Sequence, residues 1–281
     1  MGTTGPNLRS GQYGNGRNLA ARIGLHERFS TNSYGWHRWV FDQLDLPDGA
    51  RILEVGCGNG ALWLKNKDRL HASLDITLSD FSVGMVRDAR RNLARVPHGI
   101  RCIVADAQTL PFHDETFDRV IANHMLYHVP RIDAALGEIR RVLASGGRLV
   151  AATNGRDHLR EIQALLDEFD ARLAGEFNSL THEPFSLETG AAQLAPWFDS
   201  IEKRRYEDSL LITEASPLIE YVNSSLTAGP LLGSRLSEFR AFVQRRLACE
   251  GAILVRKETG LFAARPSSGR FPPPVGQARL P

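Results

Sequence analysis

Three glycines spaced two apart, Gly56, Gly58 and Gly60, could hold a ligand against bare backbone. They follow the apolar run 51–55, which predicts a buried parallel strand, and they precede a helical pattern over 61–70. A glycine turn between a strand and a helix exposes backbone N–H groups at the carboxyl edge of a sheet, where ligands bind. The spacing therefore predicts a binding site for a nucleotide-like ligand.

The charge beside this turn separates two kinds of ligand. With Ala61 after Gly60, the letters also satisfy the dinucleotide pattern G-x-G-x-x-A, so an NAD(P)-dependent oxidoreductase is one interpretation. Glu54, however, places a carboxylate two residues before Gly56, where a dinucleotide site holds an anionic pyrophosphate. A cationic ligand suits this carboxylate better, and the oxidoreductase remains the alternative.

Two aspartates follow the next two predicted strands. Asp80 ends the strand 74–79, at about the distance from the glycines at which an acidic residue accepts the hydroxyl groups of a ribose. Its other interpretation is a helix-capping residue. Asp106 ends the strand 101–105 and is followed by Ala107; on its own, Asp106 could equally cap a loop.

The run E-V-G-C-G-N-G, the two aspartates and the segment LPFHDETFDRVIANHMLYHV (110–129) together resemble the class I S-adenosylmethionine-dependent methyltransferases. The similarity covers residues 50–153 and is to the small-molecule, quinone-biosynthesis branch (methyltransferase domain 11). It implies S-adenosyl-L-methionine as cofactor, with the adenine at Asp106 and Ala107. The residues assigned to the cofactor are Glu54, Gly56, Cys57, Gly58, Asn59, Gly60, Asp80, Phe81, Met85, Asp106, Ala107 and Asn123.

The resemblance and the alternation of strand and helix patterns predict an α/β fold: a Rossmann-like, doubly wound, mostly parallel seven-stranded sheet. A helix at 132–143 should stop at Gly146 and Gly147 before a strand at 148–153. Residues 18–264 form the expected methyltransferase domain, with N-terminal lid helices at 18–45 and a helical cap inserted at 214–250, before the last strand. The alternative for the N-terminal helices is that they only pack against the sheet. The ends, 1–17 and the proline-rich 265–281, are expected to be flexible.

The candidate catalytic residues follow Asn123. Methyl transfer needs mainly alignment of the reactants, and a base helps when the acceptor carries a proton. His124, Tyr127 and His128 are placed for that role, and we expect one of the two histidines to face the acceptor. Pro130 predicts a loop or single turn rather than a helical metal pair, so no metal is expected. Tyr13, Tyr34 and Trp36 could wall the acceptor, or the sulfonium through cation–π contact.

Composition limits the partners. The net charge of +2 and short basic clusters argue against nucleic acid, and three cysteines without C-x-x-C spacing favour reduced thiols in a cytoplasm. No apolar run has the length of a membrane span. We therefore expect a soluble monomer or homodimer acting on a small-molecule acceptor at N, O or C. A non-catalytic cofactor-binding protein is the second alternative.

Overall fold

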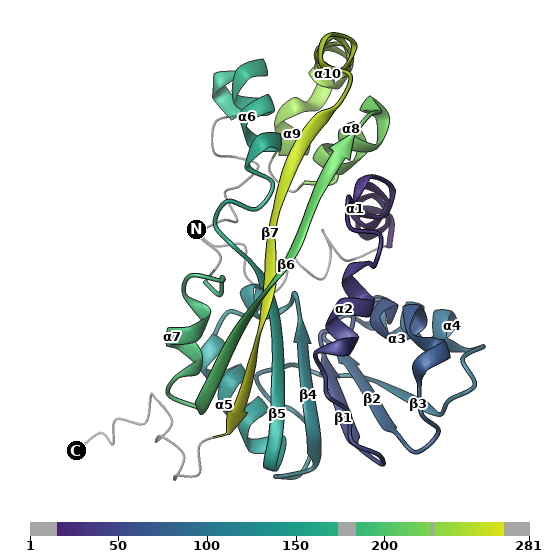
Figure 1. The fold of residues 1–281 in the computed structure, drawn as a ribbon, viewed down its shortest axis with the longest axis vertical. Coiled ribbons are helices and arrows are strands. Elements are labelled where there is room, and N and C mark those ends of the chain that lie inside the picture. Colours follow the sequence, from purple (N-terminus) through teal and green to yellow (C-terminus); the bar gives the residue numbers. More distant parts are fainter. Residues whose placement is uncertain (1–15, 174–183, 226–227, 267–281) are drawn as a thin grey trace. The chain divides into compact units, whose positions relative to one another are not determined.

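The computed structural model describes residues 16–173, 184–225 and 228–266 (Figure 1). Most of the two ends expected to be flexible lies outside these residues. The chain divides into two compact units. Unit 1 comprises residues 1–35, 155–183 and 206–259, and unit 2 comprises residues 36–154, 184–205 and 260–281. No helix among the described residues is long and apolar enough to span a bilayer.

The sheet confirms the predicted Rossmann-like architecture. Its seven strands have the order β3-β2-β1-β4-β5-β7-β6. Strands β1 to β5 pair in parallel, and the arrows of β6 and β7 point in opposite directions (Figure 1). The chain moves outward from β1 to β3 on one side and returns to β4 on the other, which makes the carboxyl ends of β1 and β4 the topological switch point. The strands are β1 (Arg51–Val55), β2 (Asp75–Asp80), β3 (Ile100–Val104), β4 (Phe117–Asn123), β5 (Leu143–Asn154), β6 (Phe198–Ile212) and β7 (Ile253–Pro266).

Helices cover both faces of the sheet in unit 2 (Figure 1). Because side chains alternate along a strand, Ile52 and Leu53 enter different cores. The core with Ile52 takes side chains from α2 (Trp36–Asp42), α3 (Ala61–Lys65) and α4 (Val83–Leu93). The core with Leu53 takes them from α5 (Ile132–Val142) and α7 (Gly190–Leu194).

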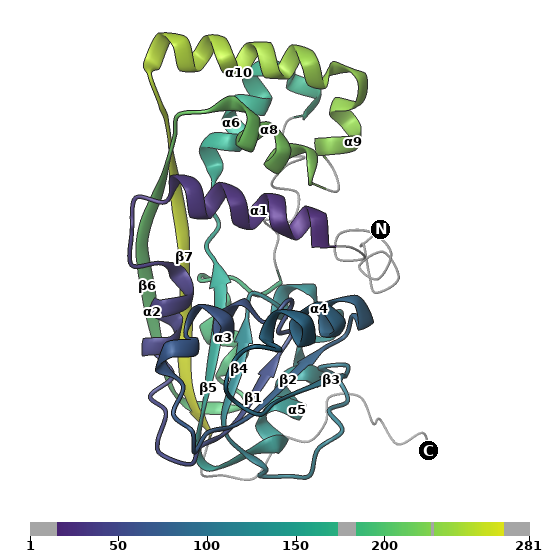
Figure 2. The same cartoon turned by 90° about the vertical axis from the view of Figure 1, so that its right-hand side faces the viewer.

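Unit 1 has its own core, formed mainly by helices (Figure 2). The helical insertion predicted before the last strand is confirmed, because three of these helices lie between β6 and β7 in the sequence. Leu25 and Phe29 of the predicted lid segment are buried in this core. The helices are α1 (Gly16–Phe29), α6 (Arg160–Phe169), α8 (Ala215–Asn223), α9 (Ala228–Leu232) and α10 (Leu236–Glu250).

Four short 3₁₀ turns complete the described elements: η2 (Lys67–Arg69), η3 (Leu126–His128), η4 (Ala171–Leu173) and η6 (Gly233–Arg235). The predicted glycine stop after α5 was wrong. The helix ends at Val142 because Leu143 adopts an extended backbone and pairs with Phe117 of β4. Gly146, with φ of 72°, instead lies within β5.

A carboxyl group lies in the interior of unit 2. Glu54 on β1 is 2% exposed, and its Oε2 accepts a hydrogen bond of 2.7 Å from the indole N–H of Trp63 on α3. Burial raises the pKa of Glu54 to about 8, which the Trp63 bond opposes and the neighbouring Asp80 reinforces. In the ligand-free protein at pH 7 this group therefore carries its proton.

This burial predicts a pH dependence of stability. Below pH 4.5 Glu54 is protonated in both states, whereas between pH 4.5 and 8 only the folded state holds the proton. Raising the pH through this window therefore favours unfolding, by up to about 1.4 kcal/mol per pH unit. We expect Glu54→Gln to remove this component, because glutamine accepts the Trp63 bond and does not titrate. Urea unfolding of both proteins at pH 5 and pH 8 measures it. Parallel pH profiles of the free energy of unfolding would contradict the assignment.

Candidate functional site

The predicted cofactor residues gather at the carboxyl ends of four adjacent strands, β3, β2, β1 and β4, all in unit 2. Asp80 ends β2, and its carbonyl oxygen accepts a 3.0 Å hydrogen bond from the N–H of Ala105, next to Asp106. Val55 lies opposite Ser79 on one side and opposite Ala122 on the other. The glycine turn is thereby flanked by Asp80 and Asn123.

Each glycine of the turn has a positive φ: 69° at Gly56, 54° at Gly58 and 77° at Gly60. A side chain at Gly56 would also collide with Met125, whose Cβ would lie 2.6 Å from the added carbon. At Gly58 the added carbon would meet no protein atom within 4 Å. Gly58 therefore leaves open space in front of the loop backbone, as close approach by a ligand requires.

Asp80 fixes the conformation of this turn. Its Oδ2 accepts the N–H of Gly58 at 2.9 Å, and its Oδ1 accepts the N–H of Ser82 at 2.8 Å. Burial raises the pKa of Asp80, and these two backbone bonds oppose the rise. The N-cap of α4 is Ser82, whose Oγ accepts the N–H of Met85 at 3.3 Å. Asp80 is therefore not the capping residue itself, and its oxygens keep lone pairs for further donors.

The neighbouring residues assigned to the cofactor differ in what they expose. Phe81 is 37% exposed, whereas Cys57 and Met85 are buried. Burial raises the pKa of the Cys57 thiol well above its usual value, so that it stays protonated. The carbonyl of Asn59 accepts a 3.0 Å bond from the side chain of Asn92 on α4, which tethers the glycine turn. Of these side chains, Phe81 has the largest exposed surface.

Asp106 and Ala107 form a tight turn after β3. The Oδ1 of Asp106 accepts the backbone N–H of Gln108 at 2.9 Å and its side-chain amide at 3.0 Å. Ala107 is 6% exposed. The turn accounts for Asp106 as a local cap, and its contact with an adenine stays a prediction.

Beyond β4, His124 has φ of 56°, in the left-handed region that non-glycine residues rarely adopt. Its N–H donates to the carbonyl of Ala152 at 3.1 Å. Its ring centroid lies 5.0 Å from that of Trp36 on α2. The indole N–H of Trp36 also donates to Oδ1 of Asn123 at 3.3 Å. Trp36 was predicted as an aromatic wall, and no local pattern indicated its bond to Asn123.

Tyr127 and His128 belong to η3, which confirms the single turn predicted from Pro130. Their ring centroids lie 4.4 Å apart. Both side chains are partly exposed. Of the other two aromatic residues predicted to wall the acceptor, Tyr34 belongs to unit 1 and is 48% exposed, and Tyr13 lies outside the described residues.

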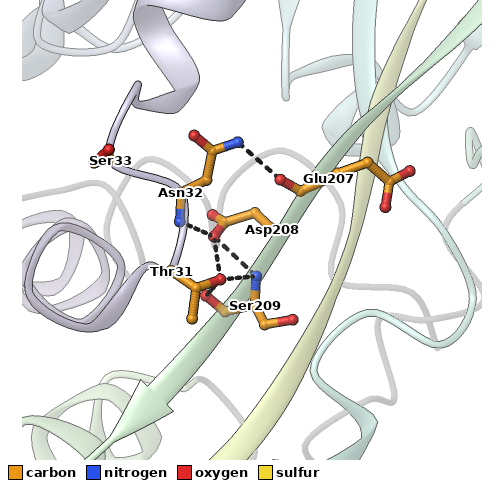
Figure 3. A pocket seen from close by; sticks show the side chains of 6 residues that line it. All are labelled: Thr31, Asn32, Ser33, Glu207, Asp208 and Ser209. Carbon is orange, nitrogen blue, oxygen red and sulfur yellow. Dashed lines mark hydrogen bonds between the residues drawn. The ribbon is translucent and has the colours of Figure 1, made fainter.

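A separate pocket of about 480 Å³ belongs to unit 1 (Figure 3). Asp208, whose side chain is fully buried, accepts hydrogen bonds there from the N–H of Asn32 at 3.0 Å and the hydroxyl of Ser30 at 2.7 Å. It also pairs with the buried Lys257. These bonds fix α1 and the following loop to β6, and none of the predicted site residues lines the pocket.

Comparisons with known proteins agree with this geometry. Residues 53–151 match the model of the methyltransferase domain family. The chain is 33% identical over 212 residues to malonyl-[acyl-carrier protein] O-methyltransferase of Geobacter sulfurreducens, covering 72% of this chain and 79% of the relative. It is 38% identical over 117 residues to demethylmenaquinone methyltransferase of Renibacterium salmoninarum, covering 42% of this chain and 46% of that protein.

Among solved structures, the YcgJ protein of Bacillus subtilis matches with a TM-score of 0.57 and 17% identity, covering 83% of this chain and 98% of YcgJ. The similarity to YcgJ supports the fold only, whereas the similarity to the Geobacter protein shows the family. The chain belongs to the class I S-adenosylmethionine-dependent methyltransferases and is an enzyme of that family.

Proposed function

We propose that the protein transfers a methyl group from S-adenosylmethionine to a small-molecule acceptor at the carboxyl edge of unit 2. The observation that carries this proposal is the alignment of the glycine turn, Asp80 and Asn123 at the ends of β1, β2 and β4. The cofactor supplies a methyl carbon on a sulfonium, which an electron pair of the acceptor can displace. Formation of S-adenosylhomocysteine in a screen of acceptors tests the activity.

The residues at this edge suit that cofactor. Gly58 leaves room for it, and Asp80 keeps acceptor capacity for ribose hydroxyls beside the turn. Phe81 offers an exposed apolar surface next to Asp80, and Asp106 with Ala107 is the proposed adenine site. Glu54 is neutral in the ligand-free protein, and a nearby positive charge would favour its ionised form. A nicotinamide dinucleotide would instead bring a pyrophosphate close to these carboxyl groups.

For the chemical step, we propose alignment as the main contribution, worth on the order of 7–11 kcal/mol when reactants are well oriented. A histidine base is the second contribution. His124 is the stronger candidate, because it directly follows β4 and has a left-handed backbone. Such a conformation costs roughly 1–2 kcal/mol and is found mainly at functional sites. His128 is the alternative, with Tyr127 packed against it.

The predicted lid at 18–45 and cap at 214–250 remain proposals for the segments that govern substrate choice. They contain the helices added to the basic sheet, and such additions commonly carry specificity. We also propose a monomer or homodimer without nucleic-acid or membrane partners. The net charge of +2, the short basic clusters and the lack of an apolar run of membrane-spanning length support this proposal.

The first test concerns Asp80. We expect Asp80→Asn to weaken binding of S-adenosylhomocysteine by about 1.5–3 kcal/mol, because a charged acceptor for the ribose is lost. Isothermal titration calorimetry measures the affinity. Asp118→Asn is the matched control, since Asp118 pairs with Arg51 at the opposite end of β1 and β4. Equal affinities of wild type and Asp80→Asn for S-adenosylhomocysteine would show that Asp80 has a purely structural role.

The second test separates the two histidines. We expect His124→Asn to lower kcat at saturating cofactor by at least about tenfold, the lower range for loss of a base. Asparagine tolerates the left-handed backbone, so the melting temperature should change little. His128→Asn is measured in parallel, and His113→Asn, in an exposed loop, serves as the control. Unchanged kcat in stable His124 and His128 variants would show that neither histidine acts as a base and that alignment of the reactants accounts for catalysis.

A further inference from the structure

The side-chain amide of Asn123 is held in one orientation. An indole N–H can only donate, so the atom 3.3 Å from Nε1 of Trp36 must be the amide oxygen. The amide nitrogen is then turned away from Trp36 with its two N–H donors. Within the described ranges, no protein group accepts a hydrogen bond from this nitrogen. Asn123 is partly exposed, so these donors are accessible to a ligand.

These donors lie beside the glycine turn. Ala122, the preceding residue, pairs with Val55 at the end of β1, and Gly56 follows directly. Met125, two residues after Asn123, packs so tightly on Gly56 that no side chain would fit there. The segment 123–125 and the proposed cofactor loop are therefore in direct contact within unit 2. The Asn123 amide therefore lies next to the loop at which the cofactor is proposed to bind.

The orienting indole is itself fixed by packing. Trp36 packs against the core that contains Ile52, and its ring centroid lies 5.4 Å from that of Trp39 and 5.0 Å from that of His124. A rotation of the Asn123 amide would place its N–H groups against the indole N–H, leaving donors facing each other. The fixed Trp36 therefore determines which end of the amide faces outward, and the surrounding flat rings suit a planar ligand.

We propose that Asn123 selects a planar acceptor bearing a hydrogen-bond-accepting oxygen, such as a phenolate or carboxylate, over a protonated amine. Trp36 is the positioning residue for this selection. The inference rests on the proposed methyl transfer for its biological meaning. An ammonium group offers only donors, so it would leave the Asn123 N–H groups unpaired, whereas an oxygen acceptor satisfies them.

A matched pair of naphthalenes tests the selection. Hydroxynaphthalene and aminomethylnaphthalene, the latter protonated at pH 7, are titrated calorimetrically into the protein saturated with S-adenosylhomocysteine. We expect wild type to prefer the hydroxyl compound by about tenfold or more, the scale of one hydrogen bond. Asn123→Asp keeps an acceptor for Trp36 but has no donor, and it should lose this preference. Trp36→Phe should reduce this preference by about threefold, because the Asn123 amide can then rotate and its hydrogen bond to the ligand oxygen is partly lost.

Trp39→Phe is the control, because Trp39 packs on Trp36 without orienting the amide. Should Asn123→Asp fail to fold, Asn123→Ala removes the amide donors without introducing a charge. In wild type, the indole N–H resonance of Trp36, assigned by its loss in Trp36→Phe among the four tryptophans, should shift on binding hydroxynaphthalene.

Two results would overturn the inference. One is the absence of a preference for the oxygen compound in wild type, through equal binding or no binding. The other is an Asn123→Asp variant that weakens only S-adenosylhomocysteine, which would assign the amide to the cofactor. Failure of the proposed function is seen separately, as no S-adenosylhomocysteine formed from S-adenosylmethionine with any acceptor, because the binding preference does not depend on turnover.

Discussion

The site depends on one hydrogen bond, from the N–H of Gly58 to the carboxylate of Asp80. The glycine turn and the end of β2 are adjacent because β1 and β2 pair in parallel, and this bond fixes the turn in its left-handed conformation. The same carboxylate also accepts the N–H of Ser82, the N-cap of α4. One side chain thus couples the loop, a strand end and a helix start, and the edge is shaped before any ligand arrives.

Around this bond the site combines buried acids with bare backbone. Glu54 and Asp80 both have raised pKa values because burial disfavours their charge. Glu54 is neutral at pH 7, and a nearby positive charge would favour its ionised form.

Much of this could be predicted from the sequence, because local patterns determine it. These patterns depend on residues that are close together in the sequence. They are the glycine spacing, the position of Asp80 and the apolar periodicities of β1 and α5. The partners of the key side chains could not be predicted. Trp63 reaches Glu54, and Trp36 reaches Asn123 across 87 positions of sequence, only through the packing of α3 and α2. The glycine stop after α5 failed because strand pairing at Leu143 overrode a local turn signal.

Binding of S-adenosylhomocysteine to the purified protein, compared with NADH in the same calorimeter, tests the central claim most directly. The arrangement of Glu54, Asp80 and the glycine turn predicts saturable heat with S-adenosylhomocysteine and none with NADH. Binding of NADH without binding of S-adenosylhomocysteine would contradict it.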